Sequence, residues 1–155
     1  MSLTLPAIVA EEAALLDRFA DLLRLEQQSL QSGKPDNLQE IVIQKAPLVD
    51  RLNQLGGHRN TVLERAGLPP DRPGMDAWLA QQAPDTRITH EWQRVLDLAR
   101  TVRALNQLNG QLLALQLQNT QEALAVLNQQ AQQSALYGSD GQSSPLTAYR
   151  IIDSA

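Results

Sequence analysis

The sequence contains no cysteine among its 155 residues and only two histidines. Without thiols the chain cannot form disulfides, thiolate metal sites or a cysteine nucleophile, so packing alone must hold its fold. A di-metal helical bundle needs a Glu-x-x-His motif on two helices, but the residues three positions before His58 and His90 are Leu55 and Arg87. We therefore predict no metal site and no cofactor.

Motifs for nucleophilic catalysis and for phosphate binding are missing as well. No serine lies in a Gly-x-Ser-x-Gly frame, and no glycine-rich loop precedes a helical pattern. Because no set of residues suggests a reaction, we expect a protein that is not an enzyme.

Positive charge is scarce, with 13 Lys and Arg against 17 Asp and Glu, a net charge of −4. Such a chain is a poor partner for nucleic acid, since phosphate contacts need a surplus of basic side chains. No run of 18 apolar residues is present, and Glu11 and Glu12 interrupt the only N-terminal stretch that could serve as a signal peptide. We expect a cytoplasmic protein without direct membrane insertion.

Aromatic residues make up only 3% of the chain, whereas leucine and alanine supply most of its 43% hydrophobic content. This composition is typical of helical bundles. We predict an all-α fold: an elongated antiparallel helical bundle of three main helices plus one short helix, with a very long C-terminal helix and a flexible C-terminal tail. The bundle is expected over residues 1–133, with helices at about 5–32, 36–66, 74–82 and 85–133, and the tail over 134–155.

Three residues mark the ends and irregularities of the first two helices. Gly33 is a natural residue to follow the C-terminus of the first helix. Lys45 interrupts the apolar face of the second helix. Pro47 lies inside that helix and cannot donate to the carbonyl of Ile43, which costs about 3 kcal/mol in a straight helix, so we expect a kink there.

The helix predicted from residue 85 is too long for its own domain. Forty-odd residues at 1.5 Å each give roughly 70 Å of helix. A compact chain of this length has a radius of gyration of about 15 Å, hence a diameter near 40 Å. One end of the helix should therefore stand out of the bundle or lie against something else, which is a first sign of a partner.

Charge changes sharply along this helix. Residues 85–105 carry seven Asp, Glu and Arg side chains, whereas residues 106–133 carry only Glu122. The second part consists mainly of Leu, Ala, Gln and Asn. An apolar, nearly uncharged helix surface usually marks a contact site.

Asn106, Asn109 and Gly110 lie at the start of the uncharged part, and two interpretations remain open. In the structural one, an asparagine fixes the helix register and the glycine lets a neighbouring helix approach closely. In the functional one, a groove that receives a partner's amphipathic helix has a floor formed by Asn106, Asn109, Gly110, Leu112, Leu113 and Leu117. The tryptophans Trp78 and Trp92 are expected in the core or at the bundle end.

The two motifs "LNQLNGQLL" and "LYGSDGQ", in this order near the end of the chain, resemble the FlgN family of flagellar export chaperones. The family pattern Asn-x-x-Asn-Gly-x-Leu-Leu matches Asn106, Asn109, Gly110, Leu112 and Leu113. The family's tail pattern Tyr-Gly-x-x-Gly-Gln matches Tyr137, Gly138, Gly141 and Gln142. Pro47 departs from the family, in which a straight second helix is expected.

The resemblance implies a cytosolic chaperone that binds the C-terminal segments of the junction proteins FlgK and FlgL. It would prevent their premature assembly and deliver them to the type III export gate protein FlhA, as a monomer or weak homodimer. The alternative is a self-associating coiled-coil scaffold, suggested by heptad spacing from Ile88 to Val102. Partner binding is expected at Leu105, Asn106, Asn109, Gly110, Leu112, Leu113, Leu117, Leu124 and Leu127, and export-gate docking at Tyr137, Gly138, Gly141 and Gln142.

Overall fold

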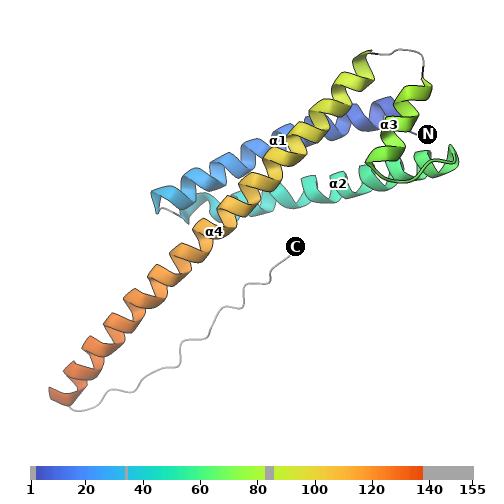
Figure 1. The fold of residues 1–155 in the computed structure, drawn as a ribbon. Helices are drawn as coiled ribbons and strands as arrows, with labels where there is room; N and C mark the ends of the chain where they lie inside the picture. The colour runs from blue at the N-terminus through green and yellow to red at the C-terminus, as the bar shows by residue number, and fades with distance from the viewer. Residues whose placement is uncertain (1–2, 34, 83–85, 138–155) are drawn as a thin grey trace. The chain divides into compact units, whose positions relative to one another are not determined.

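Figure 1 shows a computed structural model of the chain, which describes residues 3–33, 35–82 and 86–137. Over these three ranges the secondary structure is helical and contains no strand, which confirms the all-α prediction. The helices are α1 (Leu5–Ser32), the short 3-10 helix η1 (Pro35–Asn37), α2 (Leu38–Arg65), α3 (Arg72–Gln81) and α4 (Thr86–Tyr137).

The chain divides into two compact units, residues 1–116 and residues 117–155. The first unit contains α1, η1, α2, α3 and α4 as far as Gln116. In the second unit, the described residues are those of α4 from Leu117 to Tyr137. The helix thus extends beyond the expected end at residue 133, and the remainder of the expected tail lies outside the described residues.

Helices α1 and α2 pack side by side in antiparallel directions (Figure 1). Their ion pairs show the register, because Glu12 pairs with Arg59 near one end and Glu26 pairs with Lys45 near the other. The two carboxylates are 14 residues apart on α1, and the two cations are 14 residues apart on α2. Fourteen residues are two heptads, so both pairs lie on the same face of the hairpin.

The connection between α1 and α2 agrees with the prediction at Gly33, but the start of α2 lies later than predicted. Gly33 follows α1 with a φ of 68°, a left-handed conformation that glycine adopts without steric cost. The second helix was expected from residue 36, but Pro35–Asn37 form a 3-10 turn and α2 starts at Leu38. Helix α2 then continues through Pro47 without interruption.

Helix α3 begins earlier than the expected residue 74, because Asp71 caps its N-terminus. The side chain of Asp71 accepts a hydrogen bond from the backbone N–H of Gly74 at 2.9 Å, and a proline occupies the first turn. Gly74 itself is required by close packing. A Cβ atom at this position would lie 1.8 Å from the carbonyl oxygen of Pro69.

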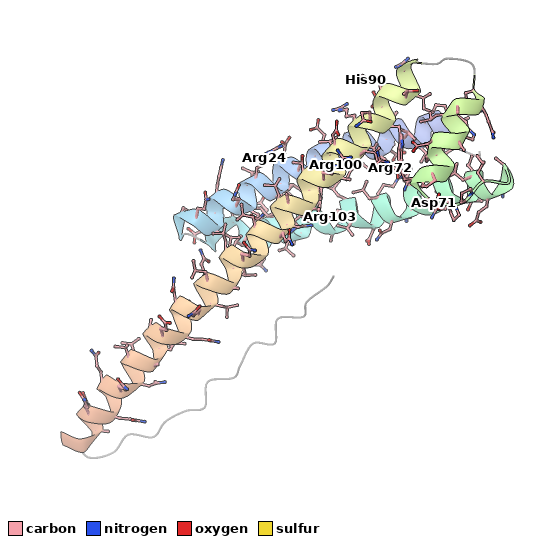
Figure 2. The ribbon with its side chains drawn as sticks, viewed as in Figure 1. Arg24, Asp71, Arg72, His90, Arg100 and Arg103 are labelled. Atoms are coloured by element: carbon pink, nitrogen blue, oxygen red, sulfur yellow. The ribbon has the colours of Figure 1, made fainter. Side chains whose placement is uncertain are left out.

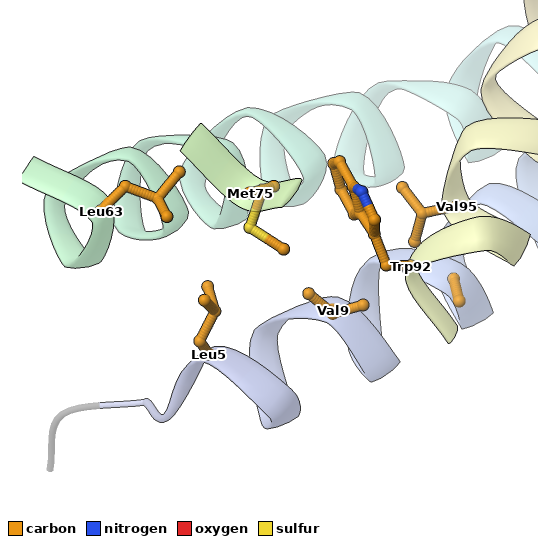
Figure 3. Packing of buried hydrophobic residues seen from close by; sticks show 7 residues of the cluster. Leu5, Val9, Leu63, Met75, Trp92 and Val95 are labelled. Atoms are coloured by element: carbon orange, nitrogen blue, oxygen red, sulfur yellow. The ribbon is translucent and has the colours of Figure 1, made fainter. Parts of the chain in front are cut away.

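Two hydrophobic clusters form the core of the first unit. In the cluster of Figure 3, side chains from all four α-helices converge, and Trp92 of α4 packs beside Val9 and Met75. Trp78 packs against this cluster from α3, so both tryptophans have the core role expected of them. The second cluster, further along the hairpin, contains Phe19, Leu22, Leu23, Ile41 and Leu48, with Val102 and Leu105 of α4 packed against it.

Candidate functional site

The part of α4 in the first unit buries a heptad-spaced face. Ile88, Trp92 and Val95 are each about 95% buried, and Val102 is half-buried. The charged side chains of this part lie on its other faces, and Figure 2 shows Arg100 and Arg103 among them. This stretch is therefore an ordinary bundle helix with one apolar and one charged side.

Within this packing, Arg59 of α2 lies beside Trp92 and pairs with Glu12 of α1. Arg59 of α2 donates a hydrogen bond to Oε1 of Glu12, and its guanidinium lies 5.2 Å from the centre of the Trp92 ring. Glu12 is 4% exposed, and burial raises the pKa of its carboxyl group against the opposing attraction of Arg59. Among the described residues, Oε2 of Glu12 and Nε1 of Trp92 have no hydrogen-bond partner.

A second group with a carboxylate, a cation and an aromatic ring lies two heptads further along the hairpin. Lys45 of α2 donates to Glu26 of α1 at 2.9 Å, and its ammonium lies 5.9 Å from the centre of the Phe19 ring. The residue of α4 in this group is Asn109, whose Nδ2 donates to Glu26 and to the backbone carbonyl of Leu23, both at 2.9 Å. Lys45 therefore interrupts the apolar face of α2 for a structural reason.

These contacts separate the two asparagines of the Asn-x-x-Asn-Gly motif. Asn109 is 3% exposed and holds α4 against α1, so its contacts favour the interpretation in which an asparagine fixes helix register. Asn106 and Gly110 are exposed. A Cβ atom at Gly110 would meet nothing within 4 Å, so the packing of this chain does not require a glycine there.

The leucines expected in partner binding differ in exposure within the first unit. Leu105 and Leu112 are half-buried, and Leu105 packs against the second core cluster. Leu113 is 40% exposed. Leu108 and Leu115, which were not among the expected binding residues, are also exposed. Next to them, Gln116 donates a hydrogen bond to the backbone carbonyl of Leu30 on α1.

In the second unit, every side chain from Leu117 to residue 135 is exposed. Leu117, Leu124 and Leu127 were expected in partner binding, and Val126 joins them as a further exposed apolar side chain. Of the residues expected at the export gate, Tyr137 is the last residue of α4, and Gly138, Gly141 and Gln142 lie outside the described residues. The contacts of this second motif stay a prediction.

Sequence patterns did not reveal a groove between the end of α1 and the start of α2. Its volume is about 560 Å³, and its lining includes the apolar side chains of Leu22, Leu25 and Ile41 and the carboxylates of Asp36 and Glu40. Leu25 is 51% exposed at this groove. Val42 and Ile43 are further exposed apolar residues of α2.

Within residues 3–33, 35–82 and 86–137, no three His, Asp or Glu side chains gather as metal ligands would. Across the same residues, no helix combines the length and the hydropathy that a membrane span needs.

Comparison with known proteins decides between the families that such a bundle could represent. Residues 1–145 match the FlgN protein family. The chain belongs to the FlgN family. A flagella synthesis protein FlgN from Salmonella typhimurium is 32% identical over 142 residues, which cover 90% of each chain. The FlgN protein of Yersinia enterocolitica is 31% identical over 135 residues, covering 86% of this chain and 84% of that one.

A crystal structure of a FlgN protein from Pseudomonas aeruginosa has the same fold. It matches with a TM-score of 0.63 and 24% identity, over 68% of this chain and 82% of the other. The family resemblance inferred from two short motifs is therefore confirmed. Membership of the FlgN family links the chain to flagellum synthesis.

Proposed function

We propose that this FlgN-family chain is a cytosolic flagellar export chaperone. It binds the C-terminal amphipathic segments of FlgK and FlgL, keeps them from assembling prematurely and delivers them to the export gate. Membership of the FlgN family supports a flagellar role. The two junction proteins enter as partners through the family resemblance alone.

The observation that carries the proposal is the exposed apolar surface of α4 where its charges end. Leu113 is 40% exposed, Leu124 is 40% exposed and Leu127 is 58% exposed, and Glu122 is the only charged residue from 106 to 133. An amphipathic helix binds such a surface through apolar side chains spaced three and four residues apart. The glutamines and asparagines between the leucines can donate and accept hydrogen bonds, so they suit partners of either charge.

Release of the bound segment must follow binding, so the affinity should be moderate. Ordering a disordered segment costs about 2 to 5 kcal/mol of the gross contact free energy. Binding through side chains on a single helix face fits this requirement better than binding in a deep pocket would.

Calorimetry with a FlgK C-terminal peptide tests the first step. Replacing Leu112 and Leu113 with Asp should weaken binding at least about 100-fold, because two carboxylates would be desolvated in the contact. The matched control replaces Val42 and Ile43 of α2, which are 57% and 65% exposed, with Asp and should bind as the original chain does. Equal loss of binding in both double variants would contradict the assignment to α4.

The C-terminal motif is proposed to dock on the gate protein FlhA through Tyr137, Gly138, Gly141 and Gln142. This division of roles predicts that Tyr137→Ala leaves the affinity for the FlgK peptide unchanged and reduces export of FlgK from cells. If Tyr137→Ala also abolished peptide binding, the two motifs could not have separate roles.

A further inference from the structure

The groove between α1 and α2 lies at the end of the hairpin away from α3 (Figure 1). On α1 its lining consists of Leu22, Leu25, Gln28, Ser29 and Ser32. The hydrogen bonds that hold α4 instead reach Leu23, Glu26 and Leu30. At about 100° per residue, the two sets lie about 140° apart around α1. The packing of α4 therefore leaves the groove open.

The groove has an apolar floor and an apolar wall. Leu22 and Ile41 are buried beneath it, and the exposed Leu25 stands beside them. A single exposed leucine is common on protein surfaces and needs no explanation. Here, however, it borders a hollow of about 560 Å³, in which an apolar side chain of another molecule would lose contact with water together with Leu25. The shape of the groove thus favours a partner with an apolar face.

Charge on the groove is negative. Asp36 and Glu40 are the two charged residues of its described lining, and within the described part of the chain neither forms an ion pair. Glu40 accepts a hydrogen bond from Gln44 of the same helix at 3.4 Å. By contrast, all five carboxylates of α1 form ion pairs with lysine or arginine side chains.

Two basic side chains of this end of the hairpin are engaged elsewhere. Arg24 pairs with Asp21 at 2.8 Å, and Lys45 pairs with Glu26 at 2.9 Å. Lys34, next to the groove in the sequence, lies outside the described residues. A cation of a partner would therefore complement the two carboxylates of the groove, since opposite charges across an interface select the partner and its register.

We propose that this groove binds a basic amphipathic helix of another protein. The apolar face of that helix lies against Leu25, and two Lys or Arg side chains four residues apart pair with Asp36 and Glu40, which have the same spacing. From Leu22 to Ser32 the groove follows α1 for about 15 Å, which accommodates about three turns of a helix. This second binding surface goes beyond the proposed chaperone role and does not depend on it.

Isothermal titration calorimetry on the full chain tests the proposal with a synthetic helical peptide. The peptide contains about 14 residues of Ala, Leu and Lys, with the leucines on one face and the lysines four residues apart beside them. Because the contact is small, we expect a dissociation constant of roughly 10 to 100 μM. A counterpart with Glu in place of every Lys should bind at least about tenfold more weakly. Absence of binding by the lysine peptide, or equal binding by both peptides, would overturn the proposal.

The charge contribution is measured with two double variants that change the net charge equally. Asp36→Asn with Glu40→Gln should weaken binding of the lysine peptide by about 3- to 30-fold, the range expected for two exposed ion pairs. Asp50→Asn with Glu64→Gln is the matched control, since both residues are exposed on α2 outside the groove, and should change the affinity by less than about twofold. An equal effect of both double variants would mean that the peptide responds to net charge and not to the groove.

The apolar contribution is measured at Leu25. Leu25→Gln should weaken binding about tenfold, because the leucine surface buried by the peptide is lost. Val42→Gln is the control: Val42 is also exposed but does not line the groove, so the affinity should stay within about twofold. Circular dichroism checks that both variants remain folded, as expected for glutamine at exposed helix positions. Unchanged affinity of Leu25→Gln would contradict the proposed contact.

The α4 variant Leu112→Asp with Leu113→Asp distinguishes this inference from the proposed function. It should lose affinity for the FlgK peptide and bind the lysine peptide at least as tightly as the original chain does. If it lost the lysine peptide, that peptide would bind α4 and the groove would have no assigned partner. If the original chain bound the lysine peptide but not the FlgK peptide, the chaperone role would fail and the groove would stand.

Nuclear magnetic resonance of the labelled full chain locates the bound peptide. Addition of the lysine peptide should shift the backbone amide signals of Leu25 and Glu40 and leave those of Asp50 and Glu64 in place. Shifts of the groove signals on raising the concentration of the chain alone would assign the groove to a second copy and overturn the proposal.

Discussion

Apolar residues at the start of α4 are buried in the first unit of the chain, whereas apolar residues of its second unit are exposed. In the first unit, Ile88, Trp92 and Val95 are buried, with Trp92 and Val95 in a cluster that includes residues of α1, α2 and α3, and charged side chains lie on the opposite faces. In the second unit, Leu117, Leu124 and Leu127 are exposed, and charge is almost missing. An apolar stripe alone therefore does not say whether a helix face belongs to the core. The charge on the remaining faces is the distinguishing feature, because a core-facing helix needs charged side chains to stay soluble, whereas a contact surface avoids them.

The largest test of this difference compares one large apolar residue from each unit. Trp92→Ala should lower the free energy of unfolding by about 3 to 5 kcal/mol, because it opens a cavity in the core and removes the contact with Arg59. Leu127→Ala should change it by less than about 0.5 kcal/mol, since Leu127 is 58% exposed. Urea denaturation at low protein concentration measures both. Similar losses in the two variants would mean that the second unit contributes to the same core.

The next effect separates two residues of one motif. Asn109→Ala should lower the free energy of unfolding by about 1 to 3 kcal/mol, because the hydrogen bonds to Leu23 and Glu26 are lost inside the bundle. Asn106→Ala should be neutral or slightly stabilising, since Asn106 is exposed and alanine has the higher helix propensity. Chemical denaturation of the two variants side by side gives the comparison. If Asn106→Ala proved the more costly change, the inward and outward assignment would be reversed.

Periodicity predicted the helices well because their apolar faces are long and regular. The bounds of α1 agree with the expected 5–32, and Gly33 has the left-handed conformation expected of it. Capping chemistry was less visible, since Asp71 starts α3 before the predicted position. The start of α2 was placed too early for a related reason, because the 3-10 turn Pro35–Asn37 resembles a first helical turn in sequence.

The polar contacts inside the bundle could not be predicted from the sequence. Glu11 and Glu12 are adjacent carboxylates, yet Glu11 forms a partly exposed ion pair with Arg51 and Glu12 is buried beside Arg59. Which of Asn106 and Asn109 faces inward depends on helix rotation, and an α-helix drifts about 20° per heptad against a heptad repeat. A small error in the assumed rotation changes which of the two asparagines faces the bundle. Only the three-dimensional structure therefore distinguishes the buried asparagine from the exposed one.

A smaller stabilising effect is expected at Gly110. This residue is exposed in the middle of α4, and a Cβ atom there would meet nothing within 4 Å. Gly110→Ala should therefore raise the free energy of unfolding by about 0.5 to 1 kcal/mol, because alanine loses less backbone entropy in a helix. Thermal and urea denaturation measure the change. A loss of stability would show that the glycine serves the fold of the chain itself.

The smallest effect concerns pH and separates the two neighbouring carboxylates of α1. Burial raises the pKa of Glu12, so between its ordinary value and its folded value the folded chain holds a proton that the unfolded chain has released. Raising the pH through that window therefore lowers the free energy of unfolding of the original chain. Glu12→Gln does not titrate, so its stability relative to the original chain should increase over the same window. The hydrogen bond from Arg51 lowers the pKa of Glu11, so that carboxylate contributes stability above its ordinary pKa and loses it as the pH falls. Glu11→Gln is thus a control of opposite sign, and urea denaturation between acidic and neutral pH follows both. If the stability of both variants relative to the original chain changed in the same direction with pH, the different surroundings of these two side chains would be contradicted.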